Sequence, residues 1–534
     1  MKQLSNSKST VLIKGTVILS LAAMLTKVLS VLYRVPFQNI VGDIGFYIYQ
    51  QVYPFYGVAI TIGTVGFPVI ISKLLAERLN NGSYTKAREM LVAAFLTIFF
   101  ITLLIFLSVF FFADRIAQKM GDENLVPLLQ TVAFSFLLVP FLSILRGFFQ
   151  GQSFMVPTAF SQIGEQLIRV TVILFSAILL MRQGAGLYKV GQAAIFASII
   201  GSVIGFIILC LFFFHNRQHS QITSWSWKDV GTTVRQIFIQ GFAVCVSGLM
   251  LILFQMSDAF QIVPTLLETG INSLEAKTIK GIFDRGQPLL QMGTVLATSL
   301  SLSLVPIISA KKIQGLEKEV DYYIKLALQI SIAIGAASSL GLILIMETFN
   351  MMLFENSKGT FVLQIFMVAI FFTTINITLT AILQGLGVVI YPSIAVLVGL
   401  FVKIALNEFF IEKWQIIGAP LATNSGLFVI TLLLIWKLKQ KTKANYITWR
   451  FTFITIKALL IMTIAVLLSF FFLQGIEKYF SNVRIYAIVI TIFAVIIGSL
   501  TFLISFIRSE VFTRAELMTL PLGDKLEKLY PRKK

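Results

Sequence analysis

The sequence predicts an all-α integral membrane protein with two pseudo-symmetric six-helix lobes around a central cavity, followed by two C-terminal helices. Three observations support this fold class: the composition, the spacing of apolar segments and an internal repeat. Of the 534 residues, 57% are hydrophobic and 13% are charged, and the mean hydropathy is +0.88. Soluble domains carry about 25% charged residues, so this chain is too apolar to be one.

The apolar segments are long enough to cross a bilayer, because a transmembrane helix needs about 20 apolar residues. No cleavable signal peptide is expected, since the first segment is too long for one and no small-residue cleavage site follows it. The spacing predicts fourteen helices, over residues 15–35, 50–72, 90–112, 126–149, 157–181, 191–214, 235–257, 286–308, 326–346, 361–385, 389–411, 416–436, 453–474 and 485–507.

Positive charge predicts the orientation of these helices. With both termini inside, 28 of the 43 Lys and Arg residues fall in inner segments and 12 in outer segments, while Lys27, Arg169 and Lys403 lie within helices. This asymmetry follows the positive-inside rule. We therefore expect a multi-pass protein of the cell membrane with both termini in the cytoplasm. The Lys and Arg residues responsible for the net charge of +19 are then expected to lie next to anionic lipid headgroups, and they do not indicate nucleic-acid binding.

Two pairs of segments indicate an internal repeat at an offset of about 235 residues. FPVIISKL at 67–74 is similar to VPIISAKK at 305–312, and FFQGQSFMVPTAF at 148–160 is similar to ILQGLGVVIYPSIA at 382–395. Six helices per half give both halves the same orientation, which predicts a pseudo-two-fold along the membrane normal with a substrate site between halves. The predicted units are an N-lobe at 1–220, a C-lobe at 221–440, and 441–534 with the last two helices and a cytoplasmic tail.

The sequence lacks the motifs of several enzyme classes. Neither a GxxxxGK[ST] phosphate loop nor an HExxH zinc motif occurs. Cys210 and Cys245 both lie in apolar runs, and His215 and His219 share a polar loop, so we expect no metal site and no cofactor. Any uphill step must draw on membrane potential, a Na⁺ or H⁺ gradient, or substrate supply, and the sequence leaves these open.

Two cations, Lys27 and Arg34, lie in the first apolar segment, and no acidic residue occurs between 14 and 37. A helix places residues seven apart on one face, here with Ser30 between them, and Pro36 is expected to end the helix nearby. A cation at the bilayer centre costs roughly 2.5–3.5 kcal/mol on insertion scales. Such a stripe faces water or an anion, although Arg34 could instead extend to the lipid headgroups.

Other intramembrane charges have two interpretations each. Glu165 and Arg169, four residues apart, form either a structural pair or a gating pair, and Lys403 takes the place of Arg169 in the second half. The Asp284–Arg285 pair opens the eighth helix as an interfacial pair or as part of the cavity. The candidate cavity or gating residues are Ser30, Arg146, Glu165, Arg169, Asp284 and Lys403.

The second predicted helix is rich in residues that loosen helical backbone. Pro54, Gly57, Gly63, Gly66 and Pro68 all lie within it. Pro and Gly at this density favour bends, which predicts a hinge, although close helix packing would also use small residues.

Three stretches resemble one known family. GTVILSLAAMLTKVLSVLYRVPFQNIVGDIGFYIYQQVYPFYGVAITIGTVGFPVIISKLLAE, LRGFFQGQSFMVPTAFSQIGEQLIRV and DRGQPLLQMGTVLATSLSLSLVPIISA are similar to the multidrug/oligosaccharidyl-lipid/polysaccharide (MOP) exporter superfamily. Within it they resemble the MurJ and stage V sporulation protein B branch of Gram-positive bacteria. The likeness spans nearly the whole chain, including the last two helices.

The resemblance implies a transporter, a lipid II flippase of peptidoglycan biosynthesis and cell shape, rather than an enzyme. It implies alternating access from inner to outer leaflet, with Lys27, Arg34 and Arg285 binding the diphosphate. The implied partners are lipid II and membrane lipids, with no nucleic acid, and the chain is expected to be a monomer. One departure is that TIGTVGFPV on the second helix lacks the family's arginine.

Three alternatives remain. The first is a flippase for another polyprenyl-diphosphate-linked glycan, such as a teichoic, capsular or spore-envelope precursor. The second is a drug/cation antiporter of the same superfamily, which would need an acid in the cavity. The third is a membrane glycosyltransferase or glycan polymerase, which would need catalytic carboxylates or DxD spacing in the outer segment 258–285.

Overall fold

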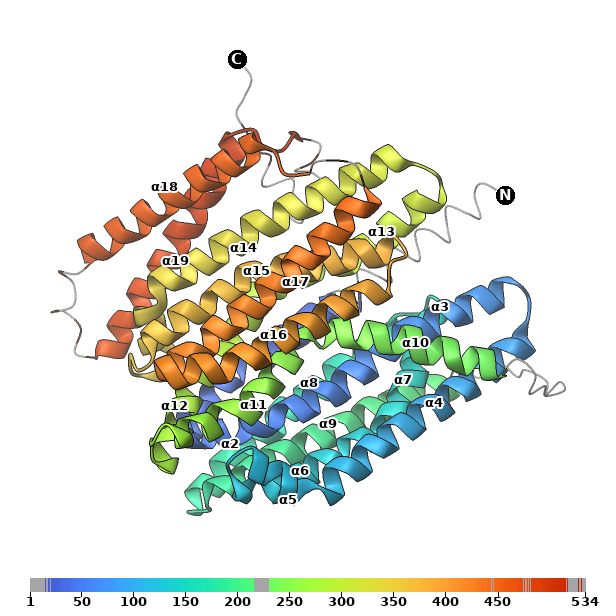
Figure 1. Cartoon of the computed structure of the whole chain (residues 1–534), viewed down its shortest axis with the longest axis horizontal. Coiled ribbons are helices and arrows are strands. Elements are labelled where there is room, and N and C mark those ends of the chain that lie inside the picture. The colour runs from blue at the N-terminus through green and yellow to red at the C-terminus, as the bar shows by residue number, and fades with distance from the viewer. Residues whose placement is uncertain are drawn as a thin grey trace. The chain divides into compact units, whose positions relative to one another are not determined.

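The computed structural model describes residues 21–215 and 230–442 throughout and most of residues 444–516, with single residues near both ends. Within these residues the secondary structure is entirely helical (Figure 1). This confirms the all-α prediction for the described part. His219 and most of the predicted cytoplasmic tail lie outside the described residues.

The chain forms two compact units. The first covers Met1–Asp284 and Val388–Ile430, and the second covers Arg285–Gly387 and Thr431–Lys534. This division follows contacts within the chain and does not test the repeat-based lobes, which stay a prediction.

The first unit contains most of the helices. They are α2 (Arg34–Thr61), the π turn η1 (Ile62–Gly66), α3 (Phe67–Asn80), α4 (Tyr84–Phe111), α5 (Ala113–Lys119), the 3-10 turn η2 (Glu123–Leu125), α6 (Val126–Ala133), α7 (Ser135–Gly151), α8 (Val156–Arg182), α9 (Leu187–His215), α10 (Val230–Gly248), α11 (Met250–Glu268), α12 (Ser273–Asp284), α16 (Ile390–Trp414) and the 3-10 turn η3 (Gln415–Ile417).

The second unit contains α13 (Gly286–Ile313), α14 (Glu317–Phe354), α15 (Thr360–Gly385), α18 (Trp449–Leu473) and α19 (Val483–Arg508). The helix α17 (Gly418–Lys441) begins in the first unit and ends in the second. Within the second unit, α18 and α19 pack against each other and against α14, as Figure 1 shows in red and yellow.

Eleven helical stretches of the described chain are long and apolar enough to cross a membrane. Two of them, Leu21–Asn80 and Ile390–Lys441, have 60 and 52 residues, more than one crossing needs. The chain is therefore a multi-pass membrane protein, and the number of fourteen helices stays a prediction.

The seventh predicted helix, 235–257, has the wrong boundaries. The structure breaks the helix at Leu249, and α11 continues to Glu268. Asp258 therefore lies on a membrane helix rather than in an outer loop. The charge of Asp258 suggested a loop. It can lie on a membrane helix because Lys403, a partner distant in the chain, neutralises it.

Proline begins several helices, because its missing N–H is unneeded in the first turn. Pro68 and Pro157 lie in the first two positions of α3 and α8. A helix ends near Pro36 as expected, because the helical run 21–32 stops just before α2 begins, and Pro36 lies in the first turn of α2. A further kink within α2 occurs at Gly42, whose φ of 70° suits glycine.

The matched repeat motifs occupy equivalent places. Gly151 ends α7 and Gly385 ends α15, and each is followed by a four-residue turn before the next helix. One turn contains Ser153 at φ 61° and the other contains Gly387 at φ 82°. This correspondence supports the internal repeat.

The second predicted crossing is irregular, as its Pro and Gly content suggested. Pro54 lies inside α2, and Gly63 and Gly66 lie in the π turn η1. Single π turns interrupt the regular hydrogen bonding of an α-helix and often occur at functional sites. The role of this segment as a hinge stays a prediction.

Candidate functional site

Arg34, the first residue of α2, is the centre of the candidate site. Its side chain is fully buried, and its guanidinium carbon lies 4.4 Å from the centroid of the Tyr53 ring. None of its three nitrogens makes a hydrogen bond in the described structure. Its charge therefore faces an aromatic ring and still has unused donors.

Arg169 on α8 is a second buried cation of the same cluster. Its guanidinium carbon lies 5.7 Å from the centroid of Tyr33 and 5.1 Å from that of Tyr56. One nitrogen donates to the Ser30 hydroxyl at 3.4 Å, whereas Nε and Nη1 have no hydrogen-bond partner in the described chain. The predicted cavity residues Ser30 and Arg169 are thus brought together.

Tyrosines line this cluster. The hydroxyls of Tyr33 and Tyr49 are 2.7 Å apart, and the Tyr49 and Tyr53 ring centroids are 5.9 Å apart. Tyr49, Tyr53 and Tyr56 share one face of α2, because they lie at positions i, i+4 and i+7. This tyrosine face was not among the predicted features, although the helical spacing of its members is present in YIYQQVYPFYG.

Glu165 pairs with Arg146 rather than with Arg169, which corrects the expected i, i+4 pair. Arg146 Nη2 lies 2.7 Å from Glu165 Oε2, and both residues are buried. Arg146 is therefore a buried cation with a carboxylate partner. Because Glu165 is already paired, Arg169 remains without a carboxylate partner among the described ion pairs.

Lys403 on α16 is also buried but is neutralised. Its ammonium lies 2.8 Å from Asp258 Oδ1 and donates to Thr423 Oγ1 at 2.7 Å. It is therefore a paired cation, unlike Arg169.

Asp284 and Arg285 have different partners, and the role of each at the interface or in the cavity stays a prediction. Asp284 lies 2.5 Å from Lys280 Nζ within α12, which is not among the candidate spans. Burial raises the pKa of the Asp284 carboxyl to about 6, and the Lys280 ammonium opposes this rise. Arg285 donates to Asn350 and Asn356 at 3.2 and 2.8 Å.

Lys27 differs from Arg34 in its surroundings. It lies on the helical run 21–32 and is exposed, whereas Arg34 is fully buried. The helical run ends at Leu32 and α2 begins at Arg34, so the two cations lie on separate helical segments. The proposed contribution of Lys27 to substrate binding stays a prediction.

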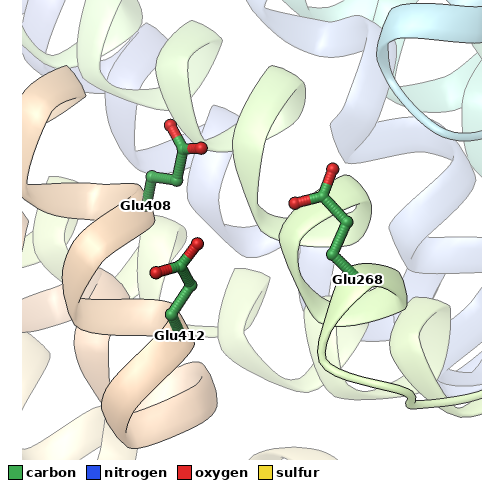
Figure 2. A group of neighbouring side chains, drawn as sticks. All are labelled: Glu268, Glu408 and Glu412. Carbon is green, nitrogen blue, oxygen red and sulfur yellow. The ribbon is translucent and has the colours of Figure 1, made fainter.

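A cluster of three glutamates lies apart from these residues. Figure 2 shows Glu408 and Glu412 on α16 directed toward Glu268 on α11. Carboxylate oxygens of all three lie within 4.8 Å of one another, and all three residues are exposed. Such oxygens suit a divalent cation, but exposed acidic groups are common without one.

The buried charges of the first unit divide into two classes. Arg146, Lys280 and Lys403 each have a carboxylate partner within 2.8 Å. Arg34 and Arg169 have none in the described structure. The site therefore carries two buried guanidinium charges, held by aromatic rings, that an anion could neutralise.

Residues 12–312 match the family described as polysaccharide biosynthesis protein. The chain belongs to this family. It is 40% identical over 527 residues to the uncharacterized membrane protein YabM of Bacillus subtilis strain 168, covering 97% of each chain. It is also 26% identical over 450 residues to the lipid II flippase MurJ of that organism, covering 80% of this chain and 82% of MurJ.

Stage V sporulation protein B of the same strain is 27% identical over 435 residues, covering 79% of this chain and 82% of that protein. Among solved structures, lipid II flippase MurJ in its inward closed conformation matches with a TM-score of 0.62 at 17% identity, covering 92% of this chain and 98% of that one. The predicted MurJ and stage V sporulation protein B branch of the MOP superfamily is confirmed, and this member of the polysaccharide biosynthesis protein family has the MurJ-like fold. Its relatives include flippases, in agreement with a transporter rather than an enzyme.

Proposed function

We propose that the chain moves lipid II from the inner to the outer leaflet by alternating access, and that Arg34 and Arg169 bind the diphosphate. The observation that carries this proposal is the pair of buried guanidinium groups without carboxylate partners in the described structure. Lys27 and Arg285, which the family resemblance assigns to the same role, are further candidates. The relatives named MurJ and stage V sporulation protein B support a lipid-linked glycan as substrate.

The energetics favour an anionic substrate. A buried charge costs several kcal/mol unless it is paired, and the rings around Arg34 and Arg169 compensate only part of this. Phosphate oxygens match the planar fork of arginine and accept two hydrogen bonds at once. A diphosphate group therefore supplies both the charge and the acceptors that the two side chains lack.

Membrane voltage favours the proposed direction. Moving one charge across the potential is worth about 2.3 kcal/mol per 100 mV. A diphosphate carries more than one negative charge and gains free energy on leaving a negative interior. The return of the empty cationic site moves positive charge toward the negative interior, so the same field also favours that step.

The proposal is tested by the flipping of fluorescent lipid II in reconstituted vesicles. We expect Arg34→Ala to abolish flipping while the protein remains folded, and Arg34→Lys to be intermediate because it keeps the charge without the fork. Arg115→Ala removes the same charge from an exposed position and is expected to leave flipping unchanged. Normal flipping by Arg34→Ala would remove the basis of the proposal.

A second candidate substrate is another polyprenyl-diphosphate-linked glycan, including a spore-envelope precursor. The similarity to stage V sporulation protein B favours it, and the cationic site reads the diphosphate that all these lipids share. Depletion of the protein followed by mass spectrometry of lipid-linked precursors distinguishes the two. Accumulation of lipid II supports the main proposal, and accumulation of a different polyprenyl glycan supports the second.

A further inference from the structure

The π turn η1 is held by side chains of α7. Ser143 donates to the Ile62 carbonyl at 3.3 Å, and Arg146 Nη1 donates to the Gly63 carbonyl at 3.1 Å. A π turn departs from the i, i+4 hydrogen bonds of an α-helix, so its carbonyls accept other donors readily. Two carbonyls of this turn thus have side-chain donors from one neighbouring helix.

Arg146 connects the turn to α8. While Nη1 bonds to the Gly63 carbonyl, Nη2 contacts Ser161 Oγ at 3.0 Å and Glu165 Oε2 at 2.7 Å. The side chain is 1% exposed. One guanidinium group therefore joins the π turn to the helix that also carries Arg169.

Glu165 continues this connection to the candidate anion site. Its other oxygen accepts from Ser202 at 3.0 Å and from the Tyr56 hydroxyl at 3.3 Å. The Tyr56 ring is the one that lies 5.1 Å from the Arg169 guanidinium carbon. Tyr56 thus touches both the carboxylate that holds Arg146 and the cation proposed to bind substrate.

We propose that Arg146 is a positioning residue that couples the diphosphate site to the π turn. This inference rests on the proposed function of Arg169. An anion that binds Arg169 competes with the Tyr56 ring for its guanidinium, and movement of Tyr56 alters the hydrogen bonds of Glu165 and hence of Arg146. The π turn then changes its backbone arrangement in response to substrate, and the transport step depends on Arg146 more than binding does.

The test reports on the π turn and on binding separately. Val65 in η1 is 45% exposed, so a spin label at Val65→Cys in a Cys210→Ala, Cys245→Ala background reports local mobility. Undecaprenyl diphosphate is the probe ligand. We expect it to change the label mobility in the otherwise wild-type chain, and we expect Arg146→Lys, which cannot reach both partners, to suppress this change.

The readout of coupling is how Arg146→Lys divides its effect between the maximal rate of lipid II flipping and the half-saturating concentration. Arg146→Lys is expected to lower the maximal rate several-fold, with a smaller change in the half-saturating concentration. Arg115→Lys, on an exposed position, is the matched control.

Tyr56→Phe is a second variant that removes one hydroxyl and keeps the ring over Arg169, so it is expected to fold. It should weaken the response of the label, whereas Tyr84→Phe at a 70% exposed position should not. If undecaprenyl diphosphate binds but the label response is the same in all variants, the inference is wrong and the proposed function stands. If undecaprenyl diphosphate does not bind the wild-type chain, both are overturned.

Discussion

At the scale of single residues, partners determine which charges remain available to a substrate. The sequence identified Arg34 and Arg169 as intramembrane cations, and the structure buries both among tyrosines. The pairing of Glu165 with Arg146 could not be predicted from the sequence, since it depends on how α7 packs against α8. Arg169 is available to bind an anion only because Glu165 is paired elsewhere. The i, i+4 spacing of Glu165 and Arg169 had suggested that these two residues neutralise each other.

The tyrosine face of α2 could have been predicted from the sequence. Its members follow helical spacing on α2, a pattern that sequence alone contains. Their contact with Arg169 on α8 depends on tertiary packing and was not predictable in the same way. Candidate cations were therefore more predictable than their surroundings.

The carboxyl of Asp284 is expected to give a pH-dependent stability. Burial raises its pKa to about 6 from the ordinary value of 3.8, so the folded protein holds this proton more tightly than the unfolded chain. The contribution to stability is fully present below about pH 4 and is lost as the pH rises through about 6.

Thermal unfolding of the wild type and of Asp284→Asn in detergent measures this contribution. The difference between the two midpoint temperatures, wild type minus variant, should be larger at pH 4.5 than at pH 7.5. A difference that does not change with pH, or that changes in the opposite direction, contradicts the raised pKa.

At the scale of elements, close helix packing fixes α7 against α3. A Cβ atom added at Gly147 would lie 2.6 Å from Ile71 Cγ2, closer than real contacts. Gly147→Ala is therefore expected to destabilise the protein by about 1–3 kcal/mol through overpacking. The midpoint of thermal unfolding should fall.

Gly231→Ala is the matched control, because no described residue lies within 4 Å of an added Cβ there. Alanine is a better helix former than glycine by about 1 kcal/mol, so this variant should be neutral or stabilising. Equal changes in both variants would show that packing at Gly147 does not constrain α7.

The helices themselves were largely predictable, because apolar length is a strong signal. An error arose where a charge suggested the end of a helix. Asp258 was assigned to a loop and lies on α11, since Lys403 neutralises it. The helix end expected near Pro36 is present, since one helical run stops at Leu32 and Pro36 lies in the first turn of α2, where proline is tolerated.

At the scale of the whole molecule, the positive-inside rule predicts topology that the structure does not test. Alkaline phosphatase fused after Gly270, between α11 and α12, is expected to be active outside. The same enzyme fused after Gly315, between α13 and α14, is expected to be inactive inside. Activities in the reverse order would contradict the orientation with cytoplasmic termini.

The family and the fold could also be predicted from the sequence, because the matched stretches extend over most of the chain. The identity of the glycan was not, since the buried cations are proposed to bind a diphosphate, which is common to many lipid-linked precursors. Specificity for the sugar depends on other contacts, which the charges of this site do not determine.

The most direct measurement of the central claim is equilibrium binding of undecaprenyl diphosphate to the purified protein in detergent, with undecaprenol as the uncharged comparison. We expect the wild type and Arg115→Ala to bind the diphosphate lipid well and undecaprenol poorly, and the double variant Arg34→Ala, Arg169→Ala to lose this preference while remaining folded. An unchanged preference in the double variant would contradict the claim that these two buried cations recognise the diphosphate.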